Sequence, residues 1–244
     1  MKRLITVWLA FSCTVSAQSV IPAGTVLPAQ LSSSVDSVKS RVGQVISARI
    51  MQDVPLPNRR IPAGARVMGR IVSITPPKTG SGSEVSFRFD TVRLSHQNIP
   101  VTTNLRALAS MREVEDAQVP KTGADRGTPW AWMTTNQIGG EVVYGQGGPV
   151  TNGSNFVGRA APGGVLVHIT SKPGSACRGE IAGNDRPQAL WLFSSDACGL
   201  YGFSELQITH AGRTDPFGQI TIASRQRRVH IQGGSGILLR VLPR

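Results

Sequence analysis

Two cysteines, Cys177 and Cys198, carry the clearest chemistry that residue types and spacing offer in this 244-residue chain. They enclose a loop of about 20 residues, which a disulfide would stabilise by roughly 3 kcal/mol by restricting the unfolded chain. A metal or redox pair is the alternative, but such pairs use C-x-x-C spacing or neighbouring ligands, and neither is present. The spacing therefore favours a structural disulfide in an oxidising compartment.

The other reactive side chains follow no catalytic or metal-binding pattern. No G-x-S-x-G elbow is present, and Ser194-Ser195-Asp196 is typical of a turn in which Ser and Asp bond their own backbone. None of the four histidines has another ligand at metal spacing: His96, His168, His210 and His230. We therefore predict no catalytic residue, no cofactor and no metal. The alternative is an enzyme whose site is assembled from distant residues.

The charge of the chain favours an anionic partner. Formal net charge is +12, from 26 basic and 14 acidic residues. The basic residues are spread out, and only Arg225, Arg227 and Arg228 cluster, so these are the candidate contacts. No aromatic residues interleave with them to stack bases, which makes a nucleic-acid partner the weaker prediction. A basic nucleic-acid-binding or polysaccharide-binding protein remains an alternative.

The N-terminus has the three-part pattern of a bacterial signal peptide over residues 1–17. Lys2 and Arg3 precede an apolar run over 4–11, and Val15-Ser16-Ala17 offers a cleavage site after Ala17. The apolar run is shorter than the roughly 20 residues that span a bilayer. Cys13 leaves a lipoprotein signal open as an alternative, although the preceding Phe11 fits it poorly.

This N-terminus predicts an exported protein of the periplasm, the outer-membrane periphery or the extracellular space. No later stretch is apolar enough for a transmembrane helix. Removing the two basic residues of the signal leaves 24 basic and 14 acidic residues, so the mature charge is about +10. In this location the expected anionic partners are lipid head groups, acidic polysaccharide or an acidic protein.

The elements that must position these residues are short strands. Gly (27) and Pro (16) are abundant, which favours strands and turns over long helices. Ile21-Pro22-Ala23-Gly24 recurs as Ile61-Pro62-Ala63-Gly64, and each copy predicts a turn that leads into a strand. Further strands are expected over 42–50, 84–94 and 99–105. This first block, residues 18–110, is expected to hold five to seven strands.

The rest of the chain is predicted as a connector and a second β block. Near-helical spacing over 105–117 suggests a short helix, and residues 111–163 form a loop-rich connector with one strand over 138–144. The second block, residues 164–244, contains the disulfide and has strands over 164–170, 188–194, 205–210, 219–223, 227–232 and 236–242. We expect a mostly-β fold of small antiparallel barrel or sandwich units, joined by the Gly/Pro-rich segment. Whether the two blocks share one core stays open.

Three motifs in the first block resemble the β-barrel domain of TrbI-like scaffold proteins of conjugal-transfer and type IV secretion systems. The motifs are Pro22–Leu31, Ala48–Val54 and Ile61–Gly69, in the order and spacing of that family. The resemblance covers about residues 20–105 and implies a barrel and an envelope scaffold role. Those scaffolds have an inner-membrane helix and a Pro-rich arm, whereas this chain has a signal pattern, so membership of a secretion channel is not implied.

Residues 120–244 resemble secreted bacterial proteins that have no assigned role. Taken together, the patterns predict a non-enzymatic exported protein that acts as a structural or interaction module of the cell envelope. Its partner is expected to be an envelope protein or an anionic surface polymer.

Overall fold

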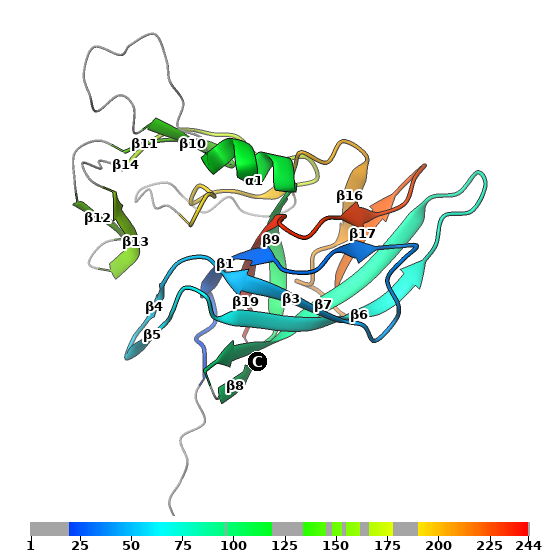
Figure 1. Cartoon of the computed structure of the whole chain (residues 1–244), viewed down its shortest axis with the longest axis horizontal. Coiled ribbons are helices and arrows are strands. Elements are labelled where there is room, and N and C mark those ends of the chain that lie inside the picture. Colours follow the sequence, from blue (N-terminus) through cyan, green and yellow to red (C-terminus); the bar gives the residue numbers. More distant parts are fainter. Residues whose placement is uncertain are drawn as a thin grey trace, which may run out of the picture.

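Strands dominate the structure. The computed structural model describes residues 20–95, 97–118, 134–144, 148–152, 155–161, 166–177 and 190–243, and these form nineteen strands and one helix. Ten of the strands belong to one sheet that bends into a nearly closed barrel, with four smaller sheets beside it (Figure 1). The mostly-β prediction is confirmed. The signal pattern and His96 lie outside the described residues.

The first block contributes nine strands, more than the five to seven expected. Six of them belong to the large sheet: β1 (Val26–Leu31), β3 (Val45–Ile50), β6 (Arg66–Thr75), β7 (Ser83–Leu94), β8 (Gln97–Pro100) and β9 (Thr103–Ala109). The other three are too short to show periodicity in the sequence: β2 (Val35–Asp36), β4 (Val54–Leu56) and β5 (Arg59–Ile61).

Helix α1 (Met111–Gln118) separates these strands from the rest of the chain. Small sheets follow: β10 (Thr134–Gln137), β11 (Gly140–Tyr144) and β14 (Leu166–Ser171) in one, β12 (Gly148–Asn152) and β13 (Asn155–Ala161) in another. The C-terminal strands are β15 (Gly199–Tyr201), β16 (Leu206–His210), β17 (Ile220–Ser224), β18 (His230–Ile231) and β19 (Gly236–Val241).

The barrel mixes strands from both ends of the chain. Its order is β15-β9-β19-β1-β3-β6-β7-β17-β16, with β8 also paired to β7. The Leu105 amide donates to the Ala211 carbonyl at 2.8 Å, which links β9 to the residue after β16 and nearly closes the barrel. The two blocks therefore share one sheet and one core, which the sequence had left open.

The repeated Ile-Pro-Ala-Gly motif forms the same turn twice. Gly24 and Gly64 have φ values of 86° and 91°, a region that glycine enters without the Cβ clash of other residues. In each turn the second residue after the alanine donates to the proline carbonyl, at 3.3 Å in the first copy and 3.2 Å in the second. The turns lead to β1 and β6, which pair with opposite edges of β3.

Alternation along each strand fills the barrel with apolar side chains. Fully buried residues in the interior include Leu27, Ile46, Phe87, Phe89 and Ile222. A second apolar cluster lies outside β9 and β19, where Leu238, Val114 of α1 and Phe193 pack together. The outer face of β9 and β19 is thus covered, whereas outward residues of β3, β6 and β7 such as Arg49, Arg66 and Arg93 are exposed in the described structure.

Four predicted elements differ from the structure. The connector over 111–163 was expected to hold one strand, but it holds β10, β11, β12 and β13, because neighbouring segments pair with each other as hairpins. The helix begins at Met111, because Leu105–Ala109 pairs with β19 as part of β9; Ser110 accepts the Glu113 amide at 3.3 Å and caps the helix. The predicted strand over 188–194 is wrong where it is described: Leu190 and Phe193 exchange backbone hydrogen bonds around a tight turn with Trp191 at φ 60°. The predicted strand over 227–232 shrinks to His230–Ile231.

Candidate anion-binding surface

Three arginines from three neighbouring strands form a row on the outside of the barrel. In the pairing register Arg49 of β3 lies opposite Arg66 of β6, and Arg66 lies opposite Arg93 of β7. Their strand neighbours Ala48, Val67 and Val92 point inward and are fully buried. Directly opposed residues of an antiparallel pair share a face, so the three exposed arginines lie side by side. Figure 1 shows β3, β6 and β7 running next to one another.

This row is electrostatically unfavourable for the isolated fold. Like charges directly opposite on neighbouring strands destabilise a sheet, whereas opposite charges stabilise it by about 0.2–1 kcal/mol per pair. No ion pair or side-chain hydrogen bond in the described part of the chain involves Arg49, Arg66 or Arg93. The row thus places three positive charges toward solvent, and no acid among the described residues forms an ion pair with them.

A second pair of arginines extends the row along the same face. Arg70 of β6 lies opposite Arg88 of β7, and both contact Asp90, with Arg70 Nη2 at 2.8 Å and Arg88 Nε at 3.2 Å from Asp90 Oδ2. Asp90 is the extra residue of a β-bulge, because Met68 pairs with Thr91 and Gly69 with Phe89.

We call the five residues Arg49, Arg66, Arg70, Arg88 and Arg93 the arginine patch. Five guanidinium groups and the single Asp90 carboxylate give it a net charge of +4. Arginine presents a planar fork of donors that matches phosphate and carboxylate oxygens, so the patch is suited to multivalent anions.

The arginine cluster that the sequence singled out is placed differently. Arg225, Arg227 and Arg228 are exposed in the loop after β17. Arg227 Nε lies 3.2 Å from Glu205 Oε2, and Arg228 Nη1 lies 3.7 Å from Asp36 Oδ2. Arg225 lines a hollow of about 360 Å³, which it shares with Ser204, Glu205, Leu206, Gln207 and Gln226. Two of the three charges are therefore matched by acids, and the structure does not join them to the arginine patch in any described contact.

The sequence did not predict the arginine patch, because its members are far apart along the chain. Within a single strand the sequence does show which residues face outward. In β6, for example, Arg66 and Arg70 are exposed, and Val67 and Gly69 between them are buried. What the sequence could not supply was the register that sets Arg49, Arg66 and Arg93 in one row, since register depends on bulges and turn lengths.

The cysteines lie as predicted. Cys177 and Cys198 form a disulfide with a Cα–Cα distance of 5.2 Å across 21 residues of sequence. The residues just before Cys177 are fastened to β15 of the barrel: Ser175 and Leu200 exchange backbone hydrogen bonds, and Tyr201 Oη donates to the Lys172 carbonyl at 3.0 Å. Burial raises the pKa of Tyr201 above its ordinary value.

Arg106 is a further basic residue, and it contacts the segment that ends at the disulfide residue Cys198. Arg106 is the extra residue of a bulge in β9, since Leu238 pairs with Ala107 and Leu239 with Leu105. Its guanidinium donates to the Ser195 carbonyl. Burial and the nearby Arg240 lower the pKa of Arg106, while Asp196 raises it. Because Arg106 holds the 190–201 segment against the barrel, we assign it a structural role.

The described histidines are engaged in local contacts. His210 Nδ1 lies 2.6 Å from the Gln219 carbonyl, and His230 Nδ1 lies 2.9 Å from Asp36 Oδ2. His168 lies in β14, and its side chain is outside the described part. Within the described ranges no three His, Cys, Asp or Glu side chains gather as a metal site.

Ser194-Ser195-Asp196 forms a turn. Ser194 Oγ donates to Asp196 Oδ1 at 2.8 Å, and the Ala197 amide donates to the Ser194 carbonyl at 3.1 Å.

Asp36 is a buried carboxylate that accepts several hydrogen bonds. It is 2% exposed and accepts the amides of Val38 and Lys39, at 2.8 and 3.1 Å, in addition to His230. Burial raises the pKa of Asp36, but these hydrogen bonds and the Arg228 charge outweigh burial, so the pKa lies below its ordinary value. The carboxylate therefore fixes the turn after β2 in its charged form.

Comparison with known proteins identifies no relative. No family model matches the chain, no curated protein matches it, and no solved structure matches its fold. Across the described residues, none of the helices has the length and apolar character needed to cross a membrane.

Proposed function

We propose that this protein is a non-enzymatic interaction module of the bacterial cell envelope that binds a polyanionic partner through the arginine patch. The observation that carries the proposal is the row of Arg49, Arg66 and Arg93, three opposed like charges that no described acid compensates. A fold gains nothing from such a row by itself, whereas an anionic partner would turn its repulsion into attraction.

Three further features support an envelope role. The N-terminal pattern is that of an export signal, and the Cys177–Cys198 disulfide suits an oxidising compartment. Residues 20–105 resemble TrbI-like scaffold domains, and members of that family organise envelope assemblies. The barrel interior is filled by apolar side chains, which supports recognition at the surface.

The proposal predicts salt-sensitive polyanion binding that depends on the row. Replacing Arg49, Arg66 and Arg93 together by Gln should weaken binding to dextran sulfate about tenfold or more, because each cation near an anionic surface contributes on the order of 1 kcal/mol. Calorimetric titration at low and high ionic strength measures this, since salt screens exposed charges. Uncharged dextran should not bind.

A matched variant controls for net charge. The control variant also loses three positive charges, but from exposed arginines elsewhere on the molecule that each lie beside an acid. Its substitutions are Arg60→Gln, Arg112→Gln and Arg227→Gln. This control should retain most of the affinity. Equal losses in both triple variants would mean that binding follows overall charge, and the patch would lose its assigned role. Binding of double-stranded DNA that is tighter than that of dextran sulfate at equal charge would favour the nucleic-acid alternative.

A further inference from the structure

Apolar side chains are exposed next to the arginine patch. Val38, Val42 and Val45 are 58%, 65% and 62% exposed, and they fall within eight residues of the chain. Lys39 and Arg41 stand between them in the sequence and are also exposed. We call Val38, Val42 and Val45 the valine rim. Isolated exposed valines are ordinary, but Val45 of this group lies directly opposite Arg70 of the arginine patch.

Val45 joins the rim to the face that carries the patch. Val45 of β3 lies opposite Arg70 of β6, which in turn lies opposite Arg88 of β7. Val45 and Arg49 are four residues apart on the same strand, so they point the same way. The outer surface of β3, β6 and β7 thus runs from Val45 through five arginines.

The turns that carry the rim are held in place. The amides of Val38 and Lys39 donate to the buried Asp36 carboxylate. Gly43 donates to the Ile71 carbonyl and Ile71 donates back to the Gln44 carbonyl, each at 2.9 Å, which ties the loop to β6. Exposure of Val42 is therefore imposed by a hydrogen-bonded turn just before β3, and the apolar side chains cost little entropy to dock.

We propose that the arginine patch and the valine rim dock the protein on an anionic lipid surface. Guanidinium forks pair with lipid phosphates, and the valines enter the layer below the head groups. The inference rests on the proposed function and names its partner. A hydrated acidic polysaccharide would satisfy the arginines alone, whereas a lipid surface offers anionic and apolar groups at the depths that both features require.

Vesicle binding tests the inference. The chain without the predicted signal, residues 18–244, is sedimented with vesicles made of equal parts phosphatidylglycerol and phosphatidylcholine, and with vesicles of phosphatidylcholine alone. We expect binding to the anionic vesicles only. Arg49→Gln, Arg66→Gln and Arg93→Gln together should reduce it about tenfold or more, and Val38→Ser, Val42→Ser and Val45→Ser together should reduce it several-fold. The valine variant should bind dextran sulfate as the unchanged protein does.

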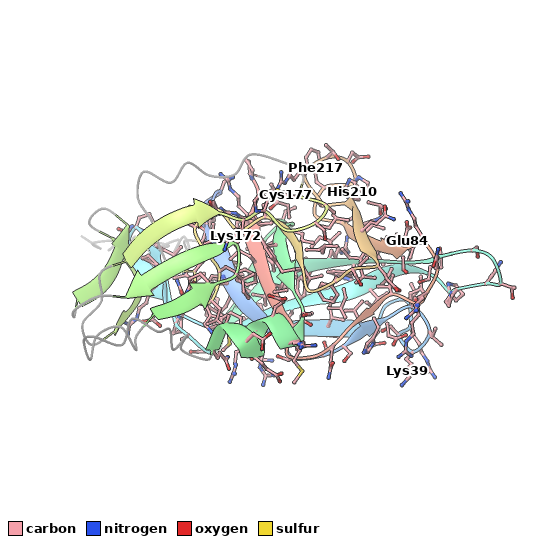
Figure 2. All side chains as sticks on the ribbon, turned by 90° about the horizontal axis from the view of Figure 1, so that it is seen from above. Lys39, Glu84, Lys172, Cys177, His210 and Phe217 are labelled. Carbon is pink, nitrogen blue, oxygen red and sulfur yellow. A yellow bond between two sulfur atoms is a disulfide. The ribbon has the colours of Figure 1, made fainter. Side chains whose placement is uncertain are left out.

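Phe217→Ser is the matched apolar control. Phe217 is 65% exposed, and Figure 2 shows it on the opposite side of the barrel from Lys39 in the rim loop. Its replacement should leave vesicle binding unchanged, and thermal melting confirms that every variant is folded.

Each result has one consequence. If the valine variant binds anionic vesicles as tightly as the unchanged protein, or if the unchanged protein binds dextran sulfate but not anionic vesicles, the lipid inference is overturned and the proposed function stands. If neither dextran sulfate nor anionic vesicles are bound, both fail.

Discussion

Asp36 shows how a single buried carboxylate supports the surface beside it. Its 2% exposure, its two backbone donors and the His230 contact hold the turn that presents Val38 and Lys39. The sequence predicted nothing at this position, because His230 lies 194 residues away and its contact depends on the pairing of β2 with β18.

The lowered pKa of Asp36 predicts acid-sensitive stability. A carboxyl whose pKa is lower in the folded than in the unfolded state stabilises the fold above its ordinary value of 3.8, and this stabilisation is lost as the pH falls through the folded value. Asp36→Asn should lower the free energy of unfolding at pH 7 by about 1–3 kcal/mol. It should also flatten the pH dependence of stability below roughly pH 4.

Urea denaturation at neutral and acidic pH measures both effects. Asp116→Asn is the control, because that side chain is 63% exposed and pairs with Arg112 only at 4.0 Å. An Asp36→Asn protein with the acid dependence of the unchanged protein would contradict the assignment.

At the scale of elements, the β6–β7 pair determines the geometry of the patch. Gly69 lies beside the bulge at Asp90, and a Cβ at Gly69 would come within 1.9 Å of the Arg88 carbonyl oxygen. Only a residue without a side chain lets the two strands approach this closely.

Gly69→Ala should therefore disturb both stability and binding. Overpacking of this kind costs about 1–3 kcal/mol, and the strand shift that relieves it would also displace Arg88. Thermal melting and dextran sulfate titration measure the two effects. Gly233→Ala is the control, since the nearest atom to its Cβ would be 3.7 Å away. A Gly69→Ala protein with unchanged stability would show that the strands can separate without cost.

Local pattern predicted the elements well where alternation and turn residues agreed. The Ile-Pro-Ala-Gly turns, β6 and β7 all follow from residues adjacent in the sequence. Leu105–Ala109 was placed in a helix because its apolar spacing suits either structure, and only the distant partner β19 decides for a strand. The arginine row was missed for the same reason, because a register between strands is a non-local property.

The whole molecule depends on strands from opposite ends of the chain. β19 lies between β1 and β9, and β17 pairs with β7. A fragment of residues 20–110 would expose these edges and remove Leu239, Val241 and Ile222 from the core. The unit that resembles TrbI-like domains should therefore not fold alone.

Circular dichroism and amide proton dispersion of the 20–110 fragment test this expectation. We expect a largely unfolded chain, with partial recovery when a 190–244 peptide is added to supply the missing strands. Cooperative melting of the fragment by itself would show that the first block is an independent domain. The full chain under the same conditions is the reference.

The position of β19 also determines when the barrel can close during synthesis of the chain. Residues 236–241 fill the space between β1 and β9, so neither neighbour has its final partner until almost all preceding residues have been synthesised. The barrel therefore cannot close until β19 has left the ribosome, and β1 and β9 keep one unpaired edge each while residues 110–235 are being added.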